Sequence, residues 1–339
     1  RLVGSEMCIR DRAGTLAGVG EFGLIARITT DLASQPADPR VVVGPGDDAA
    51  VVAVGVGRAA LTVDVLVENR HFTLEWSTPE QIGAKAAAAS LADLVAMGAT
   101  PVALVVGFCG PGTLPLSWAT ACNSGIETEA RRAGAQVVGG DVSAADQVML
   151  SITGIGDLQG RSAVLRSGAR SGDHVAVCGR LGWSAAGLAL LRAGLSEPTA
   201  LVDDHRQPRP PYELGLQAAE RASAMIDISD GLIADARHIA QASGVQIRLR
   251  RTLLPVDPLL IAAAECLERS AQPSDAVPPG DQILDWICHG GEDHALLATF
   301  PDEVPAGFTV IGQVLDGDCG VWLDTQPIKQ GGGHEHFRA

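Results

Sequence analysis

Six aspartates of this chain stand beside glycines or at the ends of expected strands and helices. They are Asp48, Asp64, Asp93, Asp141, Asp227 and Asp230. Carboxylate oxygens are the hard ligands that Mg²⁺ prefers, and Mg²⁺ usually shares its coordination with the phosphates of a substrate. If these side chains converge in the fold, the sequence predicts a phosphoryl-transfer site built from metal ions and not from a lysine-containing loop.

Known nucleotide-binding signatures do not account for these aspartates. The sequence has no GxxxxGK(S/T) loop, no HRD with DFG, no GxGxxG that opens a strand–helix unit, and no GxSxG. These absences exclude a P-loop enzyme and a protein kinase, and they argue against a dinucleotide-binding fold. Any ATP must therefore bind to a different architecture.

Several of the aspartate motifs also have an ordinary structural interpretation. GPGDDAA (44–50) and VVGGD (137–141) fit simple turns, because Gly, Pro and Asp are the commonest turn residues. IDISDG (226–231) precedes an amphipathic helix and fits a helix cap. Ser229 and the first amides of that helix suit a phosphate equally well, so both interpretations stay open.

Four further polar residues are candidates for ligand binding. Arg166, in VLRSGARSGD, offers a guanidinium fork to phosphate, with an ordinary surface arginine as the alternative. Glu292 follows two glycines in HGGED, and these let the backbone approach a ligand closely. His71 and the tail residue His334 are candidates as well, with solvated histidines as the simpler interpretation.

Composition excludes several classes of partner. With 25 Lys and Arg against 40 Asp and Glu, the formal charge is −15, which argues against nucleic acid binding and suits a protein that screens anionic substrates with cations. Seven dispersed cysteines without a CxxC pair predict neither a disulfide framework nor a zinc site, and a reducing cytoplasm is the natural location. No apolar run approaches the roughly 20 residues that span a membrane, and no signal peptide is evident.

The first residues of the chain differ from the rest. RLVGSEMCIRDR is charged, lacks periodicity and begins without Met. We therefore expect residues 1–20 to be a non-native or disordered leader and exclude them from the fold prediction.

The rest of the chain alternates expected strands and helices in two units. In the first, residues 21–160, apolar patterns predict helices at 21–32, 79–99 and 117–134 and strands within 41–54 and at 59–67, 101–108, 135–141 and 148–156. In the second, residues 161–339, they predict strands at 174–179, 294–300 and 308–312 and helices at 183–193, 213–222, 232–243 and 281–288. The proline-rich connector 197–215 is expected to lack regular structure. This order predicts a two-domain α/β (α+β) fold.

One aspartate lies inside an expected helix. In helix 79–99, Asp93 shares a stripe with Ile82, Ala86 and Met97. A carboxylate on such an apolar stripe is rarely buried unless it is paired or bound to metal. A metal-bound Asp93 is therefore favoured over a charge at the edge of the helix.

Taken together, the motifs resemble those of thiamine-monophosphate kinases. In order from Glu21 to Phe337, they are EFGLIARI, GPGDDAAVV, LTVDVLVENRHF, SLADLVAMGA with PVALVV, VVGGD, LRSGARSGD, IDISDGLIADARHIAQASG, HGGEDHALL and HEHF. The resemblance implies the two-domain fold of the aminoimidazole ribonucleotide synthetase-like superfamily, with an N-terminal sheet domain that binds ATP and Mg²⁺ and dimerises, and a C-terminal α/β domain. It also implies transfer of the γ-phosphoryl group of ATP to thiamine monophosphate, with several Mg²⁺ ions, in a homodimer.

The same resemblance implies roles for single residues. The implied magnesium ligands are Asp48, Thr62, Asp64, Asp93, Asp141, Asp227 and Asp230. The implied nucleotide contacts are Gly140, Asp141, Arg166 and Ser229, and the implied contacts to thiamine monophosphate are His71, Glu292 and His334. No residue is implied as a general base.

Two positions depart from the family pattern. Val63 stands where the family often has Thr or Ser before the aspartate of LTVD, so only its backbone carbonyl can serve a metal ion. His334 stands where the family usually has Trp or Tyr against the thiamine ring, and it offers less stacking area. These departures are the only support for one alternative, a thiamine-phosphate-binding protein with impaired catalysis.

Other members of the superfamily are the second alternative. Selenophosphate synthetases typically carry a reactive Cys or selenocysteine in a glycine-rich N-terminal segment, whereas Cys8 lies in the expected leader. The hydrogenase-maturation protein ends in a Cys, and this chain ends in HFRA. Aminoimidazole ribonucleotide synthetase shares the fold, but HGGED and VENRHF fit the kinase better.

The implied reaction needs cations more than it needs a base. The acceptor is a phosphate monoester with a second pKa of about 6, so it is largely dianionic at neutral pH. Two unit charges about 4 Å apart repel by about 4 kcal/mol at an effective dielectric constant near 20, and several such pairs meet when the acceptor approaches ATP. Divalent ions that bridge both partners offset this repulsion and hold the in-line geometry. We therefore predict strict dependence on Mg²⁺.

Overall fold

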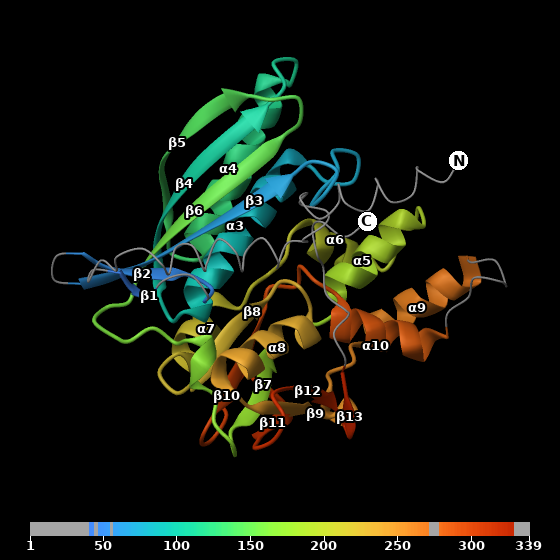
Figure 1. Cartoon of the computed structure of the whole chain (residues 1–339). Helices are drawn as coiled ribbons and strands as arrows, with labels where there is room; N and C mark the ends of the chain where they lie inside the picture. The colour runs from blue at the N-terminus through green and yellow to red at the C-terminus, as the bar shows by residue number, and fades with distance from the viewer. Residues whose placement is uncertain (1–40, 44–46, 55–56, 271–277, 329–339) are drawn as a thin grey trace, which may run out of the picture.

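A long helix lies between two β-sheets in the computed structural model, which describes residues 41–43, 47–54, 57–270 and 278–328 (Figure 1). The expected helix 21–32, the leader and the tail residue His334 lie outside the described residues. The predicted mixed α/β class is confirmed, because strands and helices alternate through both parts of the chain.

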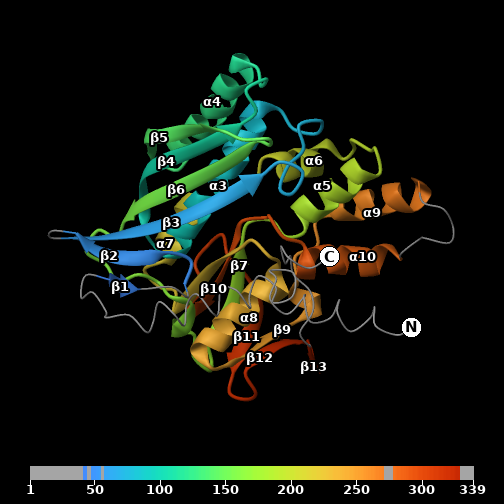
Figure 2. The same ribbon diagram turned by 45° about the horizontal axis from the view of Figure 1, so that its top comes forward.

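The N-terminal sheet has the strand order β1-β2-β3-β6-β4-β5. Its strands are antiparallel to their neighbours except β4 and β5, which are parallel. Their bounds are β1 (Val41–Val43), β2 (Ala50–Val54), β3 (Gly57–Val67), β4 (Thr100–Gly110), β5 (Gln136–Ala144) and β6 (Met149–Asp157). One face of this sheet packs against the helices α3 (Pro79–Ala96) and α4 (Leu116–Arg132), as Figures 1 and 2 show.

Helix α3 is the central element of the molecule. Thr78 caps its first turn reciprocally with Gln81, and Pro79 occupies the first helical position, where a missing amide proton costs nothing. Most of its residues from Ile82 to Ala96 are buried, which is expected of a helix that is apolar nearly all round. The small alanine side chains allow α3 to pack on the N-terminal sheet and on the C-terminal sheet at the same time.

The C-terminal sheet has the strand order β13-β12-β9-β11-β7-β10-β8. Its strands are β7 (His174–Cys178), β8 (Ala224–Ile228), β9 (Gln246–Leu249), β10 (Ala295–Phe300), β11 (Thr309–Leu315), β12 (Gly320–Leu323) and β13 (Gln326–Pro327). The helices of this part are α5 (Trp183–Arg192), α6 (Thr199–Arg206), α7 (Tyr212–Ala218), α8 (Leu232–Ser243), α9 (Pro258–Ser270) and α10 (Pro279–His289), with short 3₁₀ turns at Arg166–Gly168 and Arg251–Leu253. Strands β8, β10 and β7 form the part of the sheet that contributes to the core around α3.

The prediction that connector 197–215 lacks regular structure is wrong. Helix α6 forms inside it, because Leu201 and Val202 are buried in the C-terminal core and α5 approaches closely at Gly187. A Cβ at Gly187 would lie 2.2 Å from the carbonyl oxygen of Leu201. Tertiary packing thus selects a helix where the local proline content argues against one.

The outer face of the N-terminal sheet is unusually apolar. The face opposite α3 and α4 exposes Val63 (58%), Val65 (45%) and Val105 (36%). In the edge strand β5, Val138 (62%) and Val142 (77%) are exposed as well, although Val142 lies in the inward row of Leu66. Exposed apolar side chains gathered on one face of a sheet indicate an interaction surface.

Candidate active site

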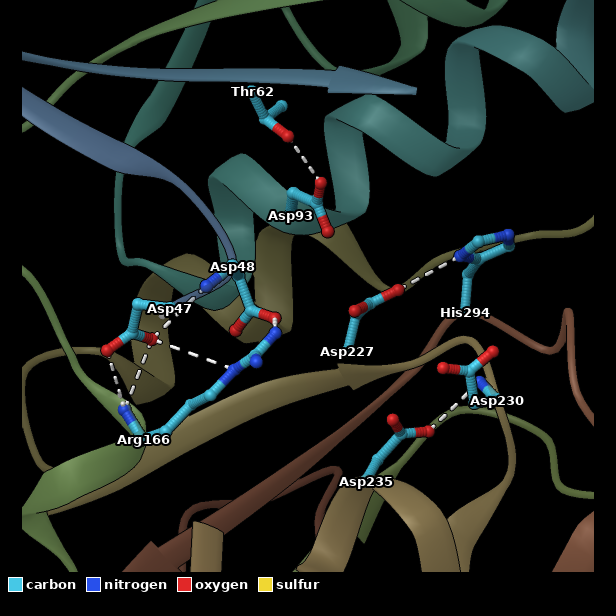
Figure 3. A network of polar contacts seen from close by, with 9 residues as sticks. All are labelled: Asp47, Asp48, Thr62, Asp93, Arg166, Asp227, Asp230, Asp235 and His294. Carbon is cyan, nitrogen blue, oxygen red and sulfur yellow. Dashed lines mark hydrogen bonds and ion pairs between the residues drawn. The ribbon is translucent and has the colours of Figure 1, made fainter. Parts of the chain in front are cut away.

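Three aspartates from distant parts of the chain meet where the two sheets approach each other. Asp48 precedes β2, Asp93 lies in the last turn of α3, and Asp227 lies in β8. Each offers a carboxylate oxygen, and these oxygens lie within 4.8 Å of one another (Figure 3). The predicted convergence therefore holds for these three side chains, which come from the segment before β2, from helix α3 and from the C-terminal sheet.

Strand β3 adds two further predicted residues to this cluster. Its even-numbered side chains point toward α3, so the Thr62 hydroxyl donates to Asp93 Oδ2 over 2.6 Å. The Ser90 hydroxyl of α3 lies 2.7 Å from Asp64 Oδ2. Val63 lies on the opposite, exposed face, so a hydroxyl side chain at this position would point away from the cluster.

The cluster is strongly acidic and largely dry. Burial, with further repulsion from Asp227 and Asp47 and partial relief from Arg166, raises the pKa of Asp48 to about 8. Burial and repulsion from Asp64 and Asp227 hold the pKa of Asp93 well above its usual range. Without a cation, the cluster must retain protons at neutral pH.

One oxygen of this cluster has no partner among the described residues. Asp48 Oδ2 is buried and accepts no hydrogen bond there, whereas Oδ1 is paired with the Arg166 guanidinium. A buried carboxylate oxygen without a donor is costly unless a cation occupies the site. The oxygen-only donor set and this orphaned atom both fit Mg²⁺.

Arg166 lies against the aspartate pair before β2. Its guanidinium contacts Asp48 and, at 3.8 Å, Asp47, and its backbone amide donates to both Asp47 oxygens at 3.2 Å (Figure 3). Sequence reasoning selected Asp48 and missed Asp47, although the doubled aspartate in GPGDDAA was the available signal. The charge of Arg166 thus screens the acidic cluster on one side.

Asp230 belongs to a neighbouring group rather than to the three-aspartate cluster. The carboxylates of Asp230 and Asp235 and the imidazole ring of His238 each offer one ligand atom, and these three atoms lie within 4.8 Å of one another. The amides of Asp230 and Gly231, at the start of α8, both donate to Asp235 Oδ2 over 3.1 Å. The amides at the start of α8, which the sequence suggested as phosphate ligands, therefore donate to the carboxylate of Asp235.

The structure places Asp141 on the face of the sheet opposite the cluster. Asp141 of β5 lies opposite Gly107 of β4, which in turn lies opposite Ser151 of β6. Ser151 lies opposite Val65 of β3, so Asp141 is in the row of Val65 on the outer face of the sheet. Gly140 lies in the row of Asp64 but three strands away, about 14 Å at the usual strand spacing. Within one chain, neither residue joins the aspartate cluster.

A cleft of about 800 Å³ opens beside the cluster. Asp64, His71, Ser229, Asp230 and Glu292 line it, so it brings five predicted site residues together. The Nδ1 atom of His71 accepts the Val67 amide over 3.0 Å, which leaves the proton of the neutral ring on Nε2. A second hollow, of about 400 Å³, is lined by Asp47, Asp48 and Thr62 on the other side of the cluster.

Sequence reasoning missed two residues that hold the site in place. His294 lies 3.0 Å from Asp227 Oδ2, and although burial lowers the pKa of His294, Asp227 more than compensates and the pKa is raised. Lys85 of α3 is buried and contacts Glu292 over 3.1 Å. Their partners lie 67 and 207 positions away in sequence, so no local pattern reveals either contact.

The fold and this site define a two-domain protein of the AIR synthase related class. Residues 46–158 match the family model described as "AIR synthase related protein, N-terminal domain", and residues 170–285 match the corresponding "C-terminal domain". Together these two matches cover most of the chain.

Within that class, the chain belongs to the thiamine-monophosphate kinase family. It is 46% identical to the thiamine-monophosphate kinase of Mycobacterium tuberculosis, across 95% of this chain and 93% of the relative, and 39% identical to that of Corynebacterium glutamicum, across 88% and 87%. It is also similar to a solved structure described as "AaThiL complexed with AMPPCP and TMP", with 33% identity and a TM-score of 0.83, across 95% of this chain and 98% of that chain.

Proposed function

We propose that this protein phosphorylates thiamine monophosphate at the expense of ATP and forms thiamine diphosphate. The observation that carries this proposal is the convergence of Asp48, Asp93 and Asp227 beside a cleft lined by His71 and Glu292. The relatives' names, thiamine-monophosphate kinase, support the same activity. A catalytically impaired binding protein is disfavoured, because Val63 faces away from the cluster and its departure removes no ligand from it.

Several Mg²⁺ ions fit the acidic residues. We propose that Asp48, Asp93 and Asp227, with Asp64 and the Thr62 hydroxyl beside them, hold these ions, and that Asp230 holds another. When bound, Mg²⁺ supplies positive charge that offsets the repulsion between the phosphates. This chain's own residues fix the carboxylates, since Ser90 orients Asp64, Thr62 orients Asp93, and His294 orients Asp227.

The two hollows suit two substrates that approach the cluster from different sides. We propose that His71 and Glu292 bind thiamine monophosphate in the larger cleft and that Arg166 contacts the phosphates of ATP. Ser229, which also lines the larger cleft, is proposed to contact the ATP phosphates where the two substrates meet. The acceptor is already an anion at neutral pH, so the site needs no general base. Its task is to orient two phosphates in line and to exclude water between them.

A homodimer accounts for Gly140 and Asp141. Both lie in the edge strand β5, far from the cluster of their own chain, and the sheet carries an exposed apolar face beside them. We propose that this face pairs with the same face of a second copy, and that Gly140 and Asp141 contribute to the nucleotide site only in that dimer.

We further propose a cytoplasmic enzyme with domains at about 21–160 and 161–339. The cysteines among the described residues are unpaired, which favours a reducing compartment. Across the described part of the chain, every helix is too short or too polar to cross a membrane.

The test is ADP release from ATP with thiamine monophosphate as acceptor, measured with excess Mg²⁺ and with excess EDTA. We expect formation of thiamine diphosphate that depends on the metal, and no comparable release with aminoimidazole ribonucleotide precursors or selenide as the other substrate. Turnover in excess EDTA, or ADP release independent of thiamine monophosphate, contradicts the proposal.

A further inference from the structure

A buried lysine lies behind the substrate cleft. Lys85 is one of only two lysines in the chain, and its side chain is 4% exposed within the alanine-rich helix α3. Its ammonium donates to Glu292 Oε2 and to the backbone carbonyl of His205, both over 3.1 Å. A lysine is almost never fully buried unless it is paired, so these two contacts account for its position.

The partner of Lys85 is held in an unusual backbone conformation at the edge of the cleft. Glu292 has φ = 63°, in the left-handed region, and its amide donates to the carbonyl of Ser229 over 2.8 Å. The preceding Gly291 presses on the same carbonyl, because a Cβ there would lie 2.5 Å from the Ser229 oxygen. The Glu292 side chain is 32% exposed, which leaves part of the carboxylate at the cleft surface.

Lys85 is the main source of positive charge for this carboxylate. Burial raises the pKa of Glu292, but the charge and the hydrogen bond of Lys85 lower it to about 2. His205 itself is neutral, because burial and the neighbouring Lys85 lower its pKa to about 3. The other ionisable groups that line this cleft among the described residues are Asp64, Arg70, His71, Arg192, Asp230, Asp285, His289 and His294.

We propose that Lys85 is a positioning residue of the thiamine-monophosphate site, because its ammonium pairs with Glu292 and holds the carboxylate of Glu292 at the surface of the cleft. The proposal rests on the proposed function and deepens it. Lys85 comes from the helix between the two sheets, whereas Glu292 and His205 belong to the C-terminal part, so one ammonium group aligns both walls of the cleft.

This arrangement suits an acceptor that carries positive charge and a donor group. Thiamine has a quaternary thiazolium nitrogen and an exocyclic amine, and an ionised carboxylate attracts both, whereas a protonated one does not. Lys85 therefore contributes to the choice of acceptor without touching it. The nucleotide contacts proposed at Arg166 lie on the other side of the aspartate cluster.

The experiment measures kcat and the KM values for thiamine monophosphate and ATP in Lys85→Met, Lys85→Gln, Lys85→Arg, Glu292→Gln and the double variant Lys85→Met/Glu292→Gln. We expect Lys85→Met and Lys85→Gln to raise the KM for thiamine monophosphate about 10- to 100-fold, the range for loss of a hydrogen bond to a charged group. The KM for ATP changes less than threefold, Lys85→Arg retains most of the affinity, and Lys85→Met adds little in the Glu292→Gln background.

A pH series separates positioning from a merely structural role. Without Lys85, burial dominates and the pKa of Glu292 rises, so the KM ratio of variant to wild type is largest near pH 5 and shrinks toward pH 9. A constant ratio, equal losses for both substrates, or full additivity with Glu292→Gln overturns the inference. If Lys85→Met and Lys85→Gln do not fold, Lys85→Arg provides the test. A rise in its KM for thiamine monophosphate as large as that of Glu292→Gln also overturns the inference. Wild-type protein without activity on thiamine monophosphate refutes the proposed function instead.

Discussion

Replacing Asp93 by Asn should make the metal-free protein more stable and the enzyme inactive. Asn keeps the size of the side chain and an oxygen that accepts the Thr62 hydroxyl, so the change removes charge and little else. Asp93 lies in a cluster with two other carboxylates whose oxygens are within 4.8 Å, and burial together with these neighbours raises its pKa well above the value of 3.8. The wild-type protein must therefore protonate this group, or tolerate repulsion, to fold at neutral pH.

The size of the effect follows from linkage. A carboxylate with a raised native pKa binds more protons in the native state, so its presence destabilises the fold increasingly as the pH rises above about 4. At pH 7 the cost is at most 1.36 × (7 − 3.8), or about 4 kcal/mol, and at pH 5 it is at most about 2 kcal/mol. Because Asp93 is only partly buried, solvent screening reduces these limits to roughly half.

The assay is urea denaturation of the wild type, Asp93→Asn and the exposed control Asp146→Asn, at pH 5 and pH 7. In EDTA at pH 7, we expect the free energy of unfolding of Asp93→Asn to exceed that of the wild type by about 2 kcal/mol, with a smaller gain at pH 5 and no change in the control. Added Mg²⁺ should stabilise the wild type but not Asp93→Asn. A variant less stable than the wild type in EDTA, or an equal Mg²⁺ response in both, refutes the reasoning.

Three further substitutions test other parts of the structure. Arg166→Met should lower kcat/KM by about 100-fold or more, because it leaves Asp48 buried without its counter-charge; steady-state kinetics with an unchanged value would contradict this pairing. Val105→Glu should shift gel filtration toward a monomer and reduce activity, since it charges the exposed outer face of the N-terminal sheet; a fully active variant with unchanged elution argues against the dimer. Gly83→Ala should destabilise the protein by about 3 kcal/mol or more, because the added Cβ would lie 2.0 Å from a backbone oxygen of α4. The control Gly112→Ala has open space around it, so thermal unfolding should show no comparable loss of stability.

Sequence periodicity predicted the inward orientation of a site residue correctly where that orientation depends on a single helix or strand. Asp93 lies on the inward stripe of α3, and Thr62 and Asp64 alternate with the exposed valines of β3. The capping residues before α3 likewise fix its start at Pro79, as expected from the sequence. In these cases local geometry determines the face, and the sheet and helix then bring the side chains together.

Asp141 shows where the same reasoning stops. A register shift between Leu104 and Val105 alters how β5 pairs with β4, and a shift of one residue moves every following side chain to the other face of the sheet. The sequence VVGGD carries no signal for that shift. For Lys85 the obstacle is distance along the chain, since its two partners are 120 and 207 residues away and only the completed fold brings them near.

The aspartate cluster combines residues from the N-terminal and C-terminal halves of the molecule. Asp48 and Asp93 belong to the N-terminal sheet and its helix, and Asp227 belongs to the C-terminal sheet, so carboxylate repulsion in the metal-free protein acts between the two halves. At 4.8 Å and an effective dielectric near 20, each ionised pair contributes about 3.5 kcal/mol of repulsion. Cation binding should therefore tighten the contact between α3 and β8, and hydrogen exchange should slow in both elements when Mg²⁺ is added. Protection confined to one of them would mean that the ions bind within a single half and that the cluster does not join the two.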